Sequence, residues 1–334
     1  MNRRAAIVLS LVVTLSAAAC GIGSSASPSS AGRQALTVGL GYIPSVQFAP
    51  FYLADQAGYY RDAGLEVTFQ NKIDPDLVTL VGQGAVDVGL ADGTSLIPAV
   101  SQGIPVRYIA TVYRDFPSIV FAKATSGITT AADLKGRKIG IPGRYGSSWI
   151  MLQALLGSAN LTPDDVQIVE YPDFGQGAAV QQGAVDAATG FANNEPVQLE
   201  LAGYPATVLH VDAIVPLPGP GLISGTATIG SKGSAIRAFV AATLRAMADI
   251  AANPDKGLDA AIVAVPDLGS ARDTQKAILM ATIAAWKGSA SGAPALGAID
   301  SAGWAASLDY MTTLGLVPNP VKVNDLITSD LLPK

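Results

Sequence analysis

The sequence predicts an α/β protein built as two lobes, and three observations support this. Short apolar segments alternate with helical patterns from Ala35 onward, which is typical of mostly parallel sheets covered by helices. The phrase QGAVD occurs at residues 83–87 and again at 182–186, each time between a helical pattern and a strand. Two copies are too few for a solenoid. At 334 residues the chain is long enough for two domains of ordinary size.

The first half alternates strand and helix patterns. A helix is predicted over 48–64 because Phe48, Phe51 and Tyr52 share one face and Gly64 is a typical helix stop. Asp76 is the predicted cap of a second helix over 76–84. Strands are predicted at 37–41, 65–69, 86–90, 106–112 and 119–122.

The same order of elements restarts near residue 128. Strands are predicted at 138–142, 167–171, 186–191 and 206–211, and helices at 147–157, 162–166 and 176–182. The Pro- and Gly-rich segment 217–221 is a stiff connector. Beyond it, the Ala-rich periodic segments 233–252, 257–264, 271–287 and 301–314 predict helices only.

Composition narrows the class of protein. Hydrophobic residues make up 49% of the chain and charged residues 14%, which indicates a compact globular protein and excludes a disordered one. The net charge is −5, and nucleic-acid binding rests on a basic surface. We therefore expect no nucleic-acid partner.

The N-terminus has the pattern of a secretory signal. Arg3 and Arg4 precede an apolar stretch that ends at Cys20, the only cysteine. A lone cysteine after small residues resembles the lipobox of bacterial lipoproteins, although Ala17 departs from it; ordinary cleavage near Ala19 is the alternative. We expect a signal peptide over 1–19, lipidation at Cys20 and a Gly/Ser-rich tether over 20–35, which would hold the protein on the extracytoplasmic side of the cell membrane.

Loops that follow predicted strands are the candidate binding site, because ligands of open α/β sheets bind beyond the carboxyl ends of the strands. Five such loops combine aromatic rings with amides, hydroxyls and carboxylates, which suits a flat, polar small molecule. The alternative is that Asp92, Thr94 and Ser147 only cap helices. The candidate ligand-binding residues are Tyr42, Gln47, Phe48, Asp92, Thr94, Tyr113, Tyr145, Ser147, Ser148, Asn193, Asn194 and Glu195.

Catalytic patterns are missing from the sequence. The single histidine, His210, lies in an apolar predicted strand, and we interpret it as structural. One histidine and one cysteine leave no Cys–His pair or His-rich metal site, and no G-x-S-x-G elbow or P-loop pattern occurs. A pair of carboxylates acting in hydrolysis stays open, but no residue signals one. We expect a binding protein that is not an enzyme, without cofactor or metal.

The segment GYIPSVQFAPFYLADQAGYYRDAGLEV resembles the substrate-binding proteins of ABC importers for sulfonates, nitrate and thiamine-precursor pyrimidines. ITTAADLKGRKIGIPG is similar to the entry into their second lobe, and the resemblance covers nearly all of residues 36–330. YIPSVQFAP, PGRYGSS and FANNEP look closest to the branch that captures riboflavin or pyrimidines. The related pyrimidine-synthesising enzymes carry a Cys-rich motif and an active-site histidine, which this chain lacks.

The resemblance implies a type II periplasmic-binding-protein-like fold whose two lobes close on a ligand. Lobe 1 would span 36–118, lobe 2 would span 119–217, and residues 218–334 would return to lobe 1. The implied function is capture of riboflavin, or a related heteroaromatic vitamin, for delivery to an ABC permease and its ATPase subunits by a monomeric, lipid-anchored protein.

Other functions remain open at the level of sequence. A thiamine-precursor pyrimidine is the nearest alternative ligand. A sulfonate or nitrate would need a cation, which Arg144 or Arg114 would have to supply. An enzyme of the pyrimidine-synthesis type, and a sensor or adhesion lipoprotein, are the alternatives from other classes.

Overall fold

The computed structural model describes residues 32–73, 75–212, 214, 217–288 and 295–333. Signal peptide, Cys20 and most of the tether lie outside the described residues. Arg33–Lys334 form one compact unit. The predicted tether is two residues too long, because Gln34 and Ala35 already belong to the first strand.

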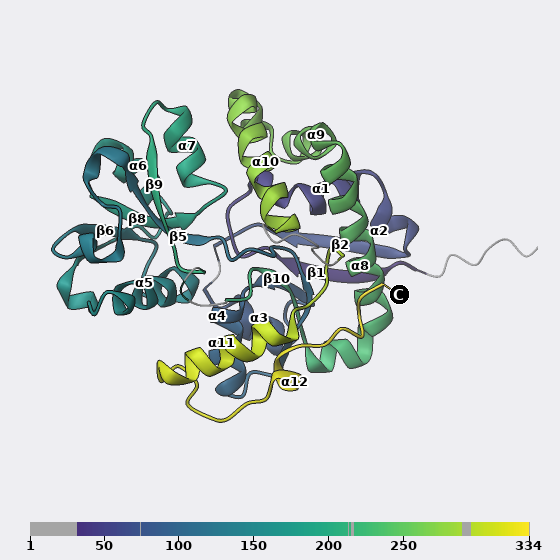
Figure 1. The fold of residues 1–334 in the computed structure, drawn as a ribbon. Helices are drawn as coiled ribbons and strands as arrows, with labels where there is room; N and C mark the ends of the chain where they lie inside the picture. The colour runs from purple at the N-terminus through teal and green to yellow at the C-terminus, as the bar shows by residue number, and fades with distance from the viewer. Residues whose placement is uncertain (1–31, 74, 213, 215–216, 289–294, 334) are drawn as a thin grey trace, which may run out of the picture. The chain divides into compact units, whose positions relative to one another are not determined.

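Two five-stranded sheets organise this unit (Figure 1). The first sheet has the order β2-β1-β3-β10-β4 and the second has the order β7-β6-β8-β5-β9. The first sheet contains β1 (Gln34–Gly39), β2 (Leu65–Gln70), β3 (Val88–Ala91), β4 (Val106–Thr111) and β10 (Gly221–Gly225). The second contains β5 (Ser118–Lys123), β6 (Lys138–Ile141), β7 (Gln167–Glu170), β8 (Ala187–Phe191) and β9 (Ala206–His210).

Strand pairing follows one pattern in both sheets. In the first, β1 pairs in parallel with β2 and β3, and β10 runs antiparallel to β3 and β4. In the second, β6 pairs in parallel with β7 and β8, and β5 runs antiparallel to β8 and β9. The chain passes from the first sheet to the second after β4 and returns before β10. The exact lobe boundaries stay predictions.

Helices cover both sheets (Figure 1). The α-helices are α1 (Ala49–Gln56), α2 (Tyr59–Asp62), α3 (Leu77–Gly82), α4 (Gly93–Ser101), α5 (Gly146–Ser158), α6 (Gln176–Gln182), α7 (Glu195–Leu201), α8 (Thr226–Ala252), α9 (Pro254–Ala264), α10 (Arg272–Lys287), α11 (Ser301–Thr313) and α12 (Val323–Leu326). Short 3₁₀ helices are η1 (Val46–Phe48), η2 (Ala124–Ser126), η3 (Ala131–Leu134), η4 (Pro163–Asp165) and η5 (Pro266–Ala271). No helix among the residues described here is long and apolar enough to cross a membrane.

Four sequence predictions need correction. The connector 217–221 leads into strand β10, where only helices were predicted. The helix predicted over 48–64 is interrupted at Gly58, whose φ of 79° lies in the left-handed region that glycine tolerates. The helix predicted from 233 is present after a kink at Lys232, but the helical residues from Thr226 that precede the kink were not predicted. Asp76 precedes α3 but makes no capping hydrogen bond through its side chain.

The two QGAVD phrases occupy equivalent positions, as predicted. Each follows a helix, turns at a glycine with φ of 76° (Gly84) or 75° (Gly183), and enters a strand. The Asp87 carboxylate accepts a hydrogen bond of 2.9 Å from the backbone N of Thr37 in β1. The Asp186 carboxylate accepts one of 2.8 Å from the backbone N of Lys138 in β6. The repeated aspartate therefore ties the start of one strand to its parallel neighbour in each sheet.

Separate apolar clusters support the two sheets. Helices α1, α8, α9 and α10 pack beside the first sheet, with Phe51, Tyr60 and Phe239 buried together. On the second sheet, Met151 and Leu152 of α5 are fully buried against strand residues. Each sheet thus has its own rigid base from which strand-end loops project.

Candidate ligand-binding cleft

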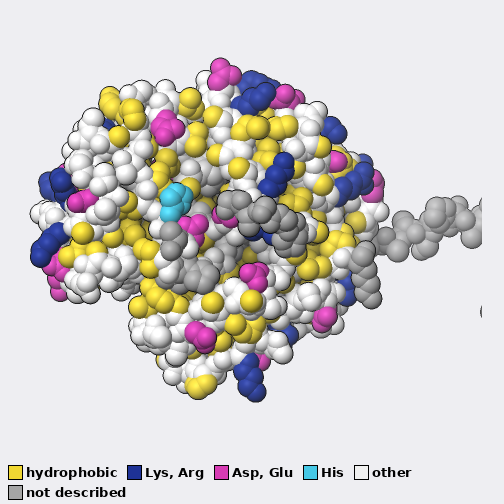
Figure 2. All heavy atoms as spheres, viewed as in Figure 1, with side chains coloured by type: hydrophobic (Ala, Val, Ile, Leu, Met, Phe, Trp, Pro, Cys, Tyr) yellow, Lys and Arg dark blue, Asp and Glu magenta, His cyan; other side chains and the backbone are white. Residues whose placement is uncertain are grey.

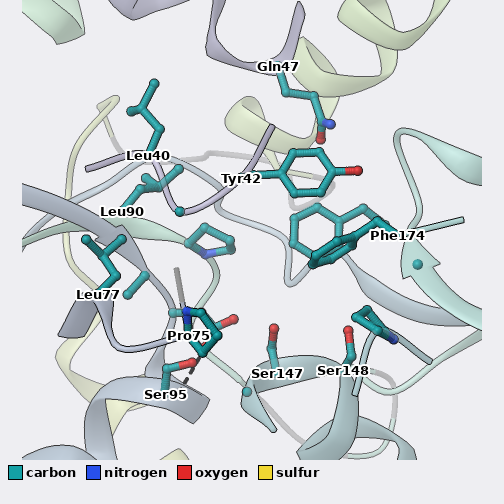
Figure 3. A pocket seen from close by; sticks show the side chains of 18 of the residues that line it. Leu40, Tyr42, Gln47, Pro75, Leu77, Leu90, Ser95, Ser147, Ser148 and Phe174 are labelled. Carbon is teal, nitrogen blue, oxygen red and sulfur yellow. Dashed lines mark hydrogen bonds between the residues drawn. The ribbon is translucent and has the colours of Figure 1, made fainter. Parts of the chain in front are cut away.

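A cavity of about 240 Å³ lies where loops from both sheets meet. Its walls include the residues that directly follow β1, β3, β6 and β8. These are carboxyl ends of parallel strands, the place where open α/β sheets bind ligands. We call this space the inner cavity (Figure 3).

Ten of the twelve predicted site residues line the inner cavity, and two do not. Thr94 is fully buried in α4, and its hydroxyl donates to Asp92 Oδ1 at 2.6 Å. Asn193 is buried behind the cavity wall. The lining residues that were predicted are Tyr42, Gln47, Phe48, Asp92, Tyr113, Tyr145, Ser147, Ser148, Asn194 and Glu195.

Sequence reasoning missed much of the apolar wall. In Figure 3, Leu40, Leu77 and Leu90 gather on one side of the cavity, away from Phe174. Leu77 is the first residue of α3, which follows strand β2. The expectation that ligands bind beyond the carboxyl ends of strands therefore applied to Leu77 as well. The lining residues missed include Leu40, Pro75, Leu77, Val78, Leu90, Phe174 and Gln176.

Asp92 is a buried carboxyl at the N-cap of α4. Its Oδ1 accepts from the backbone N of Ser95 at 3.0 Å as well as from Thr94. Burial raises the pKa of Asp92, and hydrogen bonds from Thr94, Ser95 and Ser147 offset part of that rise. Ser147 belongs to α5 beside the second sheet, so this carboxyl contacts both walls of the cleft.

Glu195 is the carboxyl of the opposite wall, at the first position of α7. Its Oε2 accepts a hydrogen bond of 2.8 Å from the backbone N of Phe191 at the end of β8. Burial raises the pKa of Glu195 to about 7, although the Phe191 bond favours the charged form. Burial, and then the charge of Glu195, raise the pKa of Tyr42.

Gln176 places a third acceptor beside the cavity. Its Nε2 donates to the carbonyl oxygen of Thr189 in β8 at 3.2 Å, which fixes the orientation of the amide because a carbonyl only accepts. Its Oε1 is buried and has no hydrogen-bond partner among the residues described. Gln176 and Glu195 are thus both held by backbone groups at the end of one strand.

Tyr42 and Phe174 form an aromatic pair across the cleft, with ring centroids 4.9 Å apart and an interplanar angle of 80° (Figure 3). Phe174 has a left-handed φ of 59°, which is uncommon for a bulky residue. Beyond the pair lies a second space of about 290 Å³, which we call the outer cavity. Tyr42, Phe174, Asn194 and Glu195 line both cavities.

A buried polar network joins the two halves behind the inner cavity. Asn193, which follows β8, donates through Nδ2 to Gln47 Oε1 at 2.9 Å and to Thr282 Oγ1 of α10 at 2.8 Å. The Tyr113 hydroxyl lies 3.5 Å from the same Gln47 oxygen. Gln47 and Asn193 were predicted as ligand contacts, but much of their hydrogen-bonding capacity serves this network.

Basic side chains stay out of the cleft. As far as the chain is described, neither cavity is lined by Lys, Arg or His. Arg144 pairs with Glu170 at 3.3 Å, and the Arg114 side chain donates to the Ala295 carbonyl at 3.4 Å. His210 lies in strand β9, as predicted, and its side chain is exposed (Figure 2), 3.7 Å from Asp212.

The sequence of this chain is similar to those of known proteins. The sequence profile of NMT1/THI5-like proteins matches residues 45–257. The chain belongs to the NMT1/THI5-like family. It is 34% identical over 305 residues to the riboflavin-binding protein RibY of Chloroflexus aurantiacus, covering 90% of this chain and 86% of that protein.

Two further known proteins are less similar in sequence. The 4-amino-5-hydroxymethyl-2-methylpyrimidine phosphate synthase of Legionella pneumophila is 25% identical over 186 residues, which is 55% of this chain and 58% of that enzyme. The periplasmic aliphatic sulphonate binding protein SsuA of Escherichia coli has a similar structure, with a TM-score of 0.68 and 21% identity over 89% of this chain and 98% of that one. The predicted periplasmic-binding-protein-like α/β fold is confirmed.

Proposed function

We propose that this chain is the substrate-binding protein of an ABC importer that captures riboflavin, or a closely related heteroaromatic vitamin, and delivers it to a membrane permease. The observation that carries the proposal is the cleft itself, which combines an apolar, aromatic wall with buried acceptors and no cationic side chain in the described lining. The 34% identity to a riboflavin-binding protein over 90% of the chain supports the same ligand.

The walls suit a ring system with polar edges. Tyr42, Phe174 and the leucines of the opposite side offer faces for a flat ring. Asp92, Glu195 and Gln176 offer oxygen acceptors for the imide N–H of a flavin edge and for the hydroxyls of its side chain. A ligand that contacts both walls stabilises the closed arrangement, because only that arrangement makes both sets of contacts.

Delivery to a permease would occur outside the cytoplasm. The signal pattern and the lipobox-like Cys20 support an anchor on the extracytoplasmic side of the membrane. The closed, ligand-bound form would be the one that the permease recognises. We propose no catalytic role, since the single histidine lies on β9 and not in either cavity lining.

An aminopyrimidine is the second candidate ligand, favoured by the match to pyrimidine phosphate synthases over about half of the chain. Its exocyclic amine would donate to the same acceptors. A sulfonate is not favoured, because the resemblance to sulfonate binders rests on fold, and Arg144 and Arg114 are engaged outside the described cavity walls.

The ligand that co-purifies with the protein tests this proposal. The full-length lipoprotein, expressed in its own envelope and extracted in mild detergent, is analysed by native mass spectrometry. We expect a bound mass equal to riboflavin, released on denaturation. An aminopyrimidine or a sulfonate bound in stoichiometric amount would contradict the riboflavin assignment.

A further inference from the structure

The walls of the cleft carry acidic groups and, within the described residues, no basic side chain in either cavity lining. Asp92 lines the inner cavity, and Glu195 lines both the inner and the outer cavity. An anion moved from water into such a site loses hydration and gains no countercharge. The cleft therefore disfavours an anionic ligand.

Glu195 holds a fixed position at the boundary between the two cavities. Its carboxylate is oriented by the backbone N of Phe191, 2.8 Å from Oε2. Gly190 leaves the room for this arrangement, since a Cβ on that residue would lie 2.8 Å from the same oxygen. Glu195 is one of four residues that line both cavities, so a ligand that occupies both lies close to this carboxyl.

The outer cavity is lined by neutral polar side chains. Gln181 of α6 and Gln198 of α7 are exposed at its walls, and Asn194 lines it as a buried side chain. Amides both donate and accept hydrogen bonds, so they suit the hydroxyls of an uncharged chain. The inner cavity alone, at about 240 Å³, is smaller than the roughly 300–1,000 Å³ of typical ligand pockets, which favours use of both spaces.

We propose that Glu195 is a specificity-determining residue that admits the uncharged vitamin and rejects its phosphate ester. The inference rests on the proposed function and adds to it the charge of the ligand. The phosphate of riboflavin 5′-phosphate sits at the end of the hydroxylated chain, so binding would bring its charge toward the carboxylate of Glu195. Repulsion of this kind weakens binding by about 10- to 100-fold.

The test compares dissociation constants for riboflavin and riboflavin 5′-phosphate at pH 8.5 and low salt. At this pH Glu195, with a pKa of about 7, is ionised. We expect the wild-type protein to prefer riboflavin by about 10- to 100-fold. Glu195→Gln should reduce that preference about tenfold. Glu200→Gln, which removes the same charge from an exposed site on α7, should leave the preference unchanged.

A second pair of variants tests the proposal without altering Glu195. Gln181→Lys adds a cation at the wall of the outer cavity, and Gln182→Lys adds one to the adjacent exposed position outside it. Gln181→Lys should tighten binding of the phosphate ester about tenfold relative to riboflavin, and Gln182→Lys should not. Thermal unfolding of each variant confirms that it is folded.

Three results are decisive. Equal affinity of the wild-type protein for riboflavin and its phosphate overturns the inference and leaves the proposed function intact. A Glu195→Gln effect no larger than that of Glu200→Gln also overturns it. Absence of any flavin binding contradicts the proposed function instead. In that case the uncharged 4-amino-5-hydroxymethyl-2-methylpyrimidine and its charged phosphate ester replace the two flavins in the test. The protein should again prefer the uncharged compound.

Discussion

Asn193 and Gln47 join the two sheets through one buried hydrogen bond of 2.9 Å between Nδ2 and Oε1. Asn193 follows β8 of the second sheet, whereas Gln47 lies in η1, just after β1 of the first. Thr282 of α10 accepts from the same Nδ2. The two sheets are thus joined beside the cleft by a contact that needs no ligand.

Asn193→Ala should weaken the contact between the two sheets. Loss of the amide leaves Gln47 Oε1 short of a donor, and we expect a cost of about 1–3 kcal/mol in the free energy of unfolding. Riboflavin affinity should fall as well, because the closed form becomes less populated. Urea unfolding and ligand titration measure the two effects. Asn253→Ala, at an exposed position without a side-chain cap, is the matched control. Equal effects of both variants would remove the role given to Asn193.

The repeated aspartates should differ in their contribution to stability. Asp87 accepts from the backbone N of Thr37 and also pairs with Lys232, whose Nζ is 2.8 Å from Oδ1. Asp186 repeats the backbone contact at Lys138 in an exposed setting. Asp87→Ala should lower the free energy of unfolding by about 2–3 kcal/mol and Asp186→Ala by about 1 kcal/mol, as urea titration would measure. A larger loss from Asp186→Ala would contradict this order.

The titration of Glu195 should make stability depend on pH. Its pKa rises from 4.5 to about 7 on folding, so between these values the folded protein holds a proton that the unfolded chain has released. Stability from this group is therefore fully present below pH 4.5 and is lost as pH rises to about 7, by roughly 3 kcal/mol in total.

The measurement is the difference in free energy of unfolding between the wild-type protein and Glu195→Gln from pH 4.5 to 8.5. Subtracting the variant isolates the contribution of Glu195. The wild-type protein should lose stability relative to the variant as pH rises, and the difference should level off above about pH 7. A flat difference, or one of opposite slope, would show that Glu195 is not held in a desolvated position.

Gly190→Ala should damage the cleft without unfolding the protein. The added methyl would lie 2.8 Å from Glu195 Oε2 and 2.9 Å from Phe121 Cε1, so the carboxyl or the ring has to move. We expect ligand affinity to fall by about tenfold or more. Gly157→Ala in α5 is the control, since a methyl group added there would meet no neighbouring group within 4 Å and alanine is the better helix former. Unchanged affinity in Gly190→Ala would argue against a ligand contact with Glu195.

Local patterns in the sequence were enough to predict most strands and the loops after them. Strand β2 was predicted at 65–69 and found at Leu65–Gln70, since its alternation directly reflects burial on one face. The QGAVD phrases marked equivalent turns in both sheets because a left-handed glycine and a strand-tying aspartate recur there. The alternation and the glycine turn depend on residues close together in the chain, whereas the aspartate contacts to Thr37 and Lys138 join distant segments and could not be predicted.

Long-range features were missed for a physical reason. Strand β10 is five residues long and lies between β3 and β4, so tertiary pairing decides its structure. Phe174 precedes helix α6, and Gln176 is its first residue. Only the contact of Phe174 with Tyr42, which comes from the first sheet, shows that this segment faces a cavity. Thr94 and Asn193 were chosen by loop position, and their side chains turn to protein partners instead.

The central claim is that the cleft binds riboflavin, and a fluorescence titration tests it most directly. The purified protein, freed of bound ligand, is added in micromolar amounts to riboflavin. Stacking of the flavin ring in the aromatic cleft should quench its emission in a saturable way, with one site per chain. Unchanged flavin emission at micromolar protein, together with tight binding of an aminopyrimidine to the same preparation, would contradict the claim.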